Sequence, residues 1–211
     1  MIFPKTGRQV FGLMKYFLVI AAYLLGSIPF GLLFGKCAGI DVRRDGSGNI
    51  GATNVTRLAG RKLGFITLLS DVLKGIVPMV AAQTLLTGGD QPLWVAACGG
   101  AAFLGHLYPV YLGFKGGKGV ATALGIFLFI APWAAVLDII IFAAVVFNWG
   151  YVSLGSLTAA LMLPGLVWLI YRAGHATGLA FLIGVFIWVK HRDNIQRLVR
   201  GEEKGWRKKR G

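Results

Sequence analysis

Two glycine-rich segments of the sequence carry side chains of the kind that bind phosphate. One is GSGNIGATNVTR, residues 46–57, and the other is GFKGGKGVAT, residues 113–122. Glycines let several backbone N–H groups converge on an oxyanion, and the N-terminus of a following helix adds about half a positive charge. The candidate residues of the two segments are Ser47, Asn49, Thr53, Asn54, Arg57, Lys115, Gly116, Gly117 and Lys118. Each segment could instead be an ordinary turn with basic anchor residues, but two such segments favour an anion site.

Neither segment satisfies a nucleotide-binding motif. The sequence GSGNIG fits the GxGxxG fingerprint, and Asp71 follows at about the distance where that fingerprint has an acidic residue. The fingerprint requires a preceding strand, whereas a long apolar segment precedes this one. The second segment fails the GxxxxGK[ST] pattern, because Gly119 follows Lys118 and the first glycine is one residue too close. We therefore expect the bound phosphate to belong to another class of ligand.

The composition is that of an integral membrane protein. Of the 211 residues, 56% are hydrophobic and only 14% are charged, and the mean hydropathy is +0.69. Lys and Arg number 22 against 8 Asp and Glu, and they lie in blocks beside apolar segments, as is typical of cytoplasmic loops. A soluble basic face interleaved with aromatic residues is not apparent in the pattern, so we predict no nucleic-acid partner.

The apolar segments predict an all-α, polytopic membrane fold with about seven transmembrane helices. The expected spans are 16–35, 63–86 and 92–112, followed by four short helices within 120–190. Polar or helix-breaking residues at 131–132, 148–150 and 171–175 separate these four. Some of the helices are marginal in length for crossing a bilayer, so five or six spans with re-entrant pieces remain an alternative.

The predicted spans also divide the chain into three parts and give its orientation in the membrane. Residues 1–14 are expected to be a dispensable N-terminal extension, 15–203 the membrane domain and 204–211 a basic tail. With seven spans, both glycine-rich segments and the C-terminus lie on one side of the membrane, because two and then four spans separate them. Their positive charge predicts that this side is cytoplasmic and that the N-terminus is outside.

Three polar residues lie inside predicted spans. Asp71 and Lys74 are three residues apart on one helical face, which predicts an ion pair in an apolar environment. Such a pair either braces the helix bundle or serves the function directly. Asp138 stands alone in AVLDIIIF, and the sequence indicates no role for it.

Histidines near the predicted cytoplasmic face are further candidates for ligand binding. His106, at the end of the third span, either positions an anion or donates to a carbonyl group. His191 and Asn194 are three residues apart where the last span ends, a spacing that places both on one face of a helix, so both can face one ligand.

The usual signatures of hydrolytic and metal-dependent catalysis are missing from the sequence. GxSxG, HExxH and HxxxxD patterns do not occur. Cys37 and Cys98 are isolated, with no spacing suited to a metal. We expect neither a metal nor a cofactor.

Three long motifs give the chain a specific family resemblance. SGNIGATNVTR (47–57), GHLYPVYLGFKGGKGVAT (105–122) and NIQRLVRGEE (194–203) occur in order, and SDVLKG (70–75) lies between the first two. Together they resemble the bacterial acyl-phosphate:glycerol-3-phosphate acyltransferase (PlsY) family over about residues 16–203. The N-terminal extension and the lysine-rich end depart from the family pattern.

The resemblance implies an enzyme of phospholipid synthesis in the bacterial inner membrane, with its active site facing the cytoplasm. It implies transfer of a fatty acyl group from acyl-phosphate, not acyl-CoA or acyl carrier protein, to the 1-hydroxyl of sn-glycerol 3-phosphate. The products are lysophosphatidic acid and phosphate. Family likeness assigns phosphate contacts to Ser47, Arg57 and Lys118, and glycerol 3-phosphate binding to His191 and Asn194. The resemblance also implies a soluble enzyme that forms acyl-phosphate as a partner.

Two other functions are compatible with basic loops on a membrane protein. An anion transporter requires a polar path at mid-membrane, commonly with inverted repeats, and no convincing internal repeat is apparent. A scaffold that binds acidic lipids does not require three ordered motifs. The clustering of hydrogen-bond donors on one predicted face favours chemistry at the membrane surface.

Overall fold

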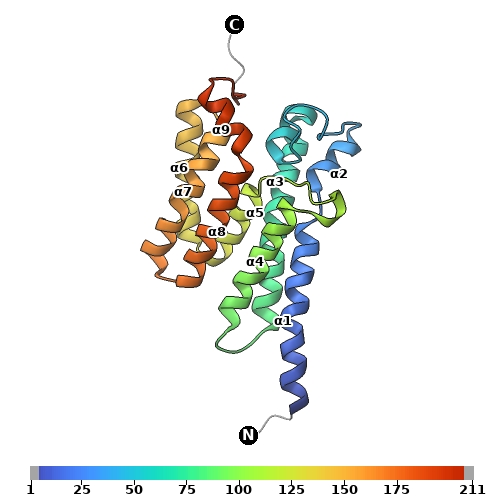
Figure 1. The fold of residues 1–211 in the computed structure, drawn as a ribbon, viewed down its shortest axis with the longest axis vertical. Coiled ribbons are helices and arrows are strands. Elements are labelled where there is room, and N and C mark those ends of the chain that lie inside the picture. Colours follow the sequence, from blue (N-terminus) through green and yellow to red (C-terminus); the bar gives the residue numbers. More distant parts are fainter. Residues whose placement is uncertain (1–4, 207–211) are drawn as a thin grey trace. The chain divides into compact units, whose positions relative to one another are not determined.

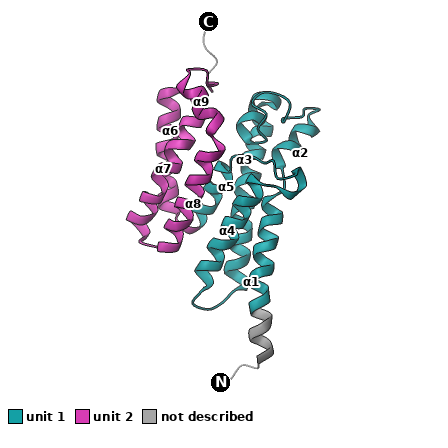
Figure 2. Cartoon of the chain, viewed as in Figure 1, with its two compact units in different colours: residues 1–129 teal, residues 130–211 magenta. Residues whose placement is uncertain are grey.

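The computed structural model describes residues 5–206, with side chains from residue 12 onward, and this part of the chain is helical without strands. It forms two compact units, residues 1–129 and residues 130–211 (Figure 2). The elements of unit 1 are α1 (Lys5–Gly26), α2 (Phe30–Cys37), α3 (Ala52–Leu85), α4 (Gln91–Leu107), η1 (Val110–Leu112) and α5 (Val120–Ile130). Those of unit 2 are α6 (Pro132–Trp149), α7 (Val152–Tyr171), α8 (Gly174–Lys190) and α9 (Arg192–Val199).

In unit 1, α1, α3 and α4 pack against one another along much of their length (Figure 1). Small residues set the distance between α1 and α4. A Cβ atom on Gly26 would lie 2.1 Å from the carbonyl oxygen of Ala102, and one on Gly105 would lie 2.3 Å from that of Tyr23. Close backbone contact at small residues is a common way for helices to associate in a membrane, where burial of apolar side chains contributes little.

The first expected span, 16–35, is two helices and not one. Helix α1 ends at Gly26 and α2 begins at Phe30, so a break separates them. Pro29 lacks a backbone N–H group and restricts the residue before it, which explains the break. The break leaves the carbonyl group of Ile28 outside both helices, where it accepts a hydrogen bond from Lys74 Nζ at 3.1 Å.

Helix α3 starts eleven residues earlier than the expected span, at Ala52 and not at residue 63. The backbone of Gly60 (φ 88°, ψ 170°) is not helical, so α3 consists of a short first segment and a long second one. A positive φ of this kind is readily adopted by glycine. The first glycine-rich segment of the sequence therefore ends inside a helix.

Unit 2 is built on α7, which packs against α6, α8 and α9. Its helices begin and end close to the breaks expected from the sequence, at Pro132, Gly150 and Arg172. Gly184 of α8 lies against the backbone of Ala160 in α7, where a Cβ atom would be 2.7 Å from the carbonyl oxygen. Helix α9 is not among the expected spans, because those are assigned from apolar length and α9 is short and polar.

Within the described part of the chain, five helical stretches are long and apolar enough to cross a membrane: Gly12–Cys37, Ala52–Leu85, Gln91–Leu112, Pro132–Trp149 and Val152–Tyr171. Two shorter apolar helices, α5 and α8, accompany them. The prediction of an all-helical, polytopic membrane protein is thus confirmed. At about 1.5 Å per residue, α5 is about 16 Å long, roughly half the thickness of the hydrocarbon core.

Candidate active site

The loop that contains the first motif is held together by the side chain of Asn54. Its Nδ2 group donates to the carbonyl oxygens of Val42, Asp45 and Asn49 at 2.9, 3.2 and 3.0 Å. Its Oδ1 atom accepts from the backbone N–H of Ser47 at 2.9 Å. With 2% of its surface exposed, Asn54 is buried beneath the loop. These bonds occupy its donors and its acceptor inside the protein.

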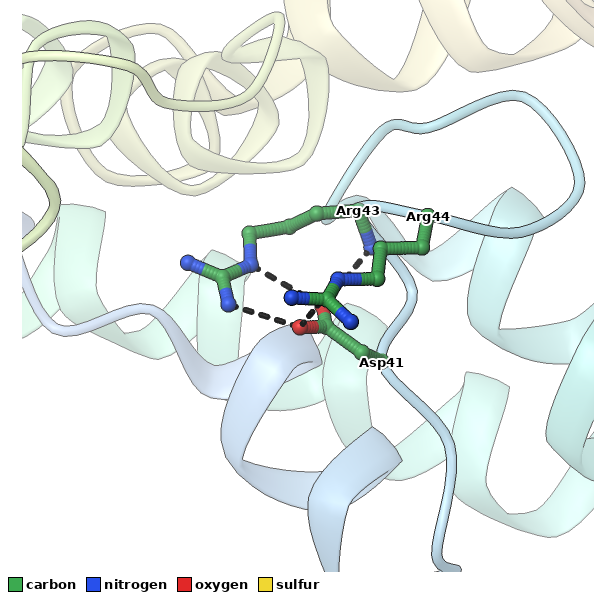
Figure 3. Close-up of polar contacts among 3 residues, drawn as sticks. All are labelled: Asp41, Arg43 and Arg44. Carbon is green, nitrogen blue, oxygen red and sulfur yellow. Dashed lines mark hydrogen bonds and ion pairs between the residues drawn. The ribbon is translucent and has the colours of Figure 1, made fainter.

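Other bonds fix the two sides of this loop. Asn49 Oδ1 accepts from the backbone N–H of Gly51 at 2.8 Å, just before α3 begins. On the opposite side, the Asp41 carboxylate accepts from Arg43 Nη2 at 2.6 Å and Nε at 2.9 Å, and Arg44 lies 4.0 Å away (Figure 3). The hydrogen bonds from Arg43 hold the pKa of Asp41 well below its ordinary value. Asp41 therefore stays ionised at neutral pH and shapes the start of the loop.

Three of the candidate donors in the first motif remain exposed at this end of unit 1. They are Ser47 in the loop and Thr53 and Arg57 in the first segment of α3. Thr53 and Arg57 are four residues apart and so share one face of the helix. Among the side chains that the structure describes, none forms an ion pair with Arg57. A hydroxyl group, a guanidinium group and a helix N-terminus at one surface are suited to a phosphate.

The second motif is a loop clamped onto the end of α4. Gly116 N–H donates to the carbonyl oxygen of Leu107 at 3.2 Å, and Gly117 N–H donates to that of His106 at 3.1 Å. We expected these two amides to converge on an oxyanion, but they are paired with α4 instead. The need for glycine is steric, because a Cβ atom on Gly117 would lie 2.2 Å from His106 Nε2. One on Gly116 would lie 2.2 Å from the His106 carbonyl oxygen.

The clamp places two lysines differently. Lys115 is exposed, whereas Lys118 is half-buried next to the start of α5. The first N–H groups of an α-helix have no partner within the helix, so the beginning of α5 can supply the donors that Gly116 and Gly117 do not.

The two motifs of unit 1 meet in one small core. Leu32, Val42, Ile50 and Val55 form a buried cluster beneath the first motif, and Leu112 of η1 packs against it. Leu112 immediately precedes the GFKGGKG loop. Shared packing therefore brings both motifs to the same end of unit 1, as the pattern of spans predicted.

In unit 2, the end of α8 and the start of α9 carry the remaining candidates. His191 and Asn194 are 3% and 6% exposed. His191 Nδ1 donates to the carbonyl oxygen of Ile187 at 2.8 Å. Because a carbonyl oxygen only accepts, Nδ1 carries the proton and the lone pair of the neutral ring lies on Nε2.

Glu203 holds Asn194 in place. Its Oε1 atom accepts from Asn194 Nδ2 at 2.7 Å and from Ser153 Oγ at 2.9 Å, and its Oε2 atom accepts from Arg197 Nε at 2.8 Å. Burial acts to raise the pKa of Glu203, but the hydrogen bonds from Asn194, Arg197 and Ser153 outweigh it, so the pKa lies below its ordinary value. An ionised Glu203 thus orients the amide of Asn194. The Nδ2 group of this amide bonds to the carboxylate, so the Oδ1 atom of Asn194 is not used in that bond.

Comparison with known proteins assigns the family. A family model described as glycerol-3-phosphate acyltransferase matches residues 16–201 of the chain. The chain belongs to the glycerol-3-phosphate acyltransferase family. A member from Desulfotalea psychrophila is 53% identical over 197 residues, which are 93% of this chain and 100% of that protein. Another from Geotalea daltonii is 52% identical over 186 residues, covering 88% and 94% of the two chains.

Solved structures agree with the family assignment. The chain is similar to a crystal structure of PlsY, an integral membrane glycerol 3-phosphate acyltransferase, in its glycerol 3-phosphate form. The TM-score is 0.87 at 41% identity, and the match covers 92% of this chain and 96% of that one. The lysophosphatidic acid form of PlsY matches with a TM-score of 0.85. The predicted family and the membrane fold are both confirmed.

Two features of this acyltransferase were missed by sequence reasoning. Glu203 is the last residue of the third motif, where the sequence indicates no separate role for it, and its carboxylate is the partner of Asn194. The residue type of Asn54 predicts a ligand-binding donor, whereas the structure shows it buried and hydrogen-bonded within its loop. In both cases the neighbouring sequence does not indicate the hydrogen-bond partners of the side chain, because those partners are brought close only by the folding of the chain.

Among residues 5–206, no cluster of three or more His, Cys, Asp or Glu side chains has the arrangement of a metal site. The cationic and amide side chains of the two units are suited to anions.

Proposed function

We propose that this chain transfers a fatty acyl group from acyl-phosphate to the 1-hydroxyl of sn-glycerol 3-phosphate. The products are lysophosphatidic acid and inorganic phosphate, and acyl-CoA and acyl carrier protein do not serve as donors. The enzyme lies in the bacterial inner membrane with its active site toward the cytoplasm. It accepts its donor from the cytoplasm or from a soluble enzyme that makes acyl-phosphate.

The observation that carries this proposal is a set of hydrogen-bond donors suited to phosphate at one end of unit 1, of which Ser47 and Arg57 are exposed and Lys118 is half-buried. Ser47, Arg57 and Lys118 surround the starts of α3 and α5 there. Both proposed substrates carry a phosphate group, so a cationic surface next to apolar helices suits the pair. The glycerol 3-phosphate and lysophosphatidic acid forms of the similar PlsY structures support the acceptor and the product.

The residues divide into those that contact substrate and those that position them. Ser47, Arg57 and Lys118 bind phosphate oxygens, and Thr53 and Lys115 add weaker contacts at the rim. His191 and Asn194 bind glycerol 3-phosphate and orient its 1-hydroxyl group. Four residues position the two loops without contacting substrate. The side chains of Asn49 and Asn54 bond to backbone groups of the first loop, and the backbone N–H groups of Gly116 and Gly117 bond to the end of α4.

The reaction needs no conventional general base in this proposal. The 1-hydroxyl oxygen attacks the acyl carbonyl carbon, the bond from that carbon to the phosphate oxygen breaks, and phosphate leaves with the bonding electrons. A phosphate oxygen of the substrates takes the hydroxyl proton. An acyl-phosphate is a mixed anhydride with a good leaving group, so charge stabilisation by Lys118 and Arg57 together with proximity can supply most of the rate. No acyl-enzyme forms.

A donor competition tests the proposal. Detergent-purified protein is given labelled glycerol 3-phosphate with acyl-phosphate, acyl-CoA or acyl carrier protein carrying the same chain, and lysophosphatidic acid is measured. We expect product and stoichiometric phosphate release with acyl-phosphate alone. Product from acyl-CoA but not acyl-phosphate overturns the donor assignment. An acylated side chain trapped with donor alone overturns the direct mechanism.

A further inference from the structure

Unit 1 contains a buried group of charged side chains that the proposed reaction does not use. Asp71 and Lys74 of α3 are 2% and 3% exposed, and Lys74 Nζ lies 2.9 Å from Asp71 Oδ1. Lys74 also donates to the carbonyl oxygen of Ile28 at the break between α1 and α2. A buried ion pair costs desolvation energy and is a weak source of stability by comparison with well-packed apolar residues. Stabilisation of the helix bundle alone therefore gives little reason for the pair.

The pair extends to His106 at the end of α4. His106 is 4% exposed, and its Nδ1 atom lies 3.7 Å from Asp71 Oδ1. This separation is longer than a direct hydrogen bond, but in a buried environment the carboxylate still attracts the N–H group of the ring. Asp71 thus favours the proton on Nδ1 and leaves Nε2 as the ring nitrogen that faces Gly117.

The other edge of the imidazole supports the GFKGGKG loop. A Cβ atom on Gly117 would lie 2.2 Å from His106 Nε2, so the ring and the Gly117 backbone are in close contact. The backbone carbonyl of the same histidine accepts from Gly117 N–H at 3.1 Å. Lys118 is the next residue. The position of the His106 ring therefore affects where the backbone of Lys118 lies and from where its side chain extends.

Helix α3 also contacts the far end of the loop. Gly75 follows Lys74, and a Cβ atom there would lie 2.5 Å from the carbonyl oxygen of Thr122 in the first turn of α5. One short stretch of α3, residues 71–75, hence lies against His106 on one side of the loop and against Thr122 on the other, with Lys118 between them in the sequence.

We propose that Asp71 and His106 are positioning residues for the transfer reaction, with Asp71 acting through the His106 ring on the Gly117–Lys118 backbone. This inference rests on the proposed function of Lys118 as a phosphate ligand. Lys74 neutralises Asp71 and links the group to the α1–α2 break. Neither Asp71 nor His106 needs to touch substrate.

The test removes both buried charges together, so that no single charge is left unpaired. The variants are Asp71→Asn with Lys74→Met, His106→Gln, and the combination of all three. Each is measured for kcat and KM with acyl-phosphate and glycerol 3-phosphate, and for amide hydrogen exchange in a peptide containing residues 113–119. The matched control is Asp90→Asn, which breaks the Lys15–Asp90 ion pair at the opposite end of the same unit.

We expect the double variant and His106→Gln each to lower kcat/KM at least about tenfold and to speed exchange in 113–119. Exchange in the α1 and α4 peptides should stay near that of the wild type. Because Asp71 acts through His106, the triple variant should be little worse than either parent, so the effects are not additive. Asp90→Asn should change thermal stability without changing exchange in 113–119.

Two results overturn the inference. One is additive losses of activity in the triple variant, which means that Asp71 and His106 act separately. The other is faster exchange throughout unit 1 with 113–119 affected no more than the rest, which means that the group only braces the bundle. A wild-type protein that makes no lysophosphatidic acid from acyl-phosphate overturns the proposed function, while the exchange data still decide whether the group positions the loop.

Discussion

Lys115 and Lys118 carry the same charge in one loop, and their surroundings separate their roles. Lys115 is exposed at the rim, whereas Lys118 is half-buried beside the start of α5. A preorganised cation close to the developing charge stabilises a transition state more than one at a solvated rim.

We predict that Lys118→Ala lowers kcat/KM by about 100-fold or more, while Lys115→Ala lowers it only a few-fold. Both variants should elute from a sizing column as the folded wild-type protein does. Initial rates of lysophosphatidic acid formation provide the measurement. Near-normal turnover by Lys118→Ala would remove this lysine from the site.

Gly117 presents a steric requirement. Its missing side chain leaves room for the His106 ring, and an added Cβ atom would lie 2.2 Å from Nε2. Gly117→Ala should therefore displace the loop and lower both activity and the melting temperature. Gly89→Ala is the matched control, because a Cβ atom at Gly89 meets nothing within 4 Å. Equal behaviour of the two variants would contradict the clamp.

Asn54 offers a nearly isosteric test of loop positioning. In Asn54→Asp, the group that donated to three carbonyl oxygens becomes an acceptor that repels them. We expect a loss of about 2 kcal/mol or more in stability and a loss of activity through Ser47. Unfolding in mixed micelles measures the first effect. Asn148→Asp, at an exposed position at the end of α6 with one bond to Ala144, should cost much less stability, because only one such bond is lost.

At the scale of elements, the chain after α9 folds back onto the start of α7. Glu203 accepts from Ser153 of α7 and from Asn194 and Arg197 of α9, and Trp206 N–H donates to the carbonyl oxygen of Gly150. This return of the chain fixes the short helix that carries Asn194. The carboxylate of Glu203, with its three hydrogen-bond donors, therefore holds α9 and the following residues against the start of α7.

The lowered pKa of Glu203 predicts how unit 2 responds to acid. Because the folded state binds the proton less readily than the unfolded state, stability rises with pH between the two pKa values. The contribution is present above the ordinary Glu pKa of about 4.5 and is lost as pH falls through the lower folded value. Melting curves of the wild type from neutral pH downward should show this loss.

Glu203→Gln removes the charge while keeping the shape of the side chain. The variant should melt lower than the wild type at neutral pH, and the difference should shrink as the pH falls below about 4.5. It should also lower kcat through Asn194. A constant difference in melting temperature across the whole range contradicts the assignment of the ionised form.

At the scale of the whole molecule, the short helix α5 decides the topology. If all seven apolar elements cross, the turns near Gly89 and Gly174 are outside, and Cys37 is cytoplasmic. If α5, about 16 Å long, does not cross, Gly174 moves to the cytoplasmic side while Gly89 and Cys37 stay where they are. We predict the first arrangement, with the C-terminus cytoplasmic.

Labelling of single cysteines distinguishes the two topologies. Gly89→Cys and Gly174→Cys have open space around the new side chain, and native Cys37 is exposed. In intact cells, a membrane-impermeant maleimide should label both new cysteines but should label Cys37 only after permeabilisation. Protection of Gly174→Cys in intact cells would show that α5 does not cross.

Much of this protein is determined by local properties of the sequence. Apolar length and the positions of Pro132, Gly150 and Arg172 marked the helices, because these depend on residues close together in the chain. Three ordered motifs identified the family. The pattern of spans predicted that the two motifs of unit 1 lie at one end, and the packing of Leu112 against the cluster that contains Ile50 and Val55 agrees.

Only the tertiary structure decided which candidate donors are exposed and which are occupied in hydrogen bonds within the protein. Asn54, Gly116 and Gly117 have residue types that suit phosphate binding, but their partners are backbone groups brought close by folding. Glu203 and Asp71 gained His or Asn neighbours from other segments in the same way. A hydrogen-bonding group has the same chemistry in either role, so its position relative to distant parts of the chain determines its function.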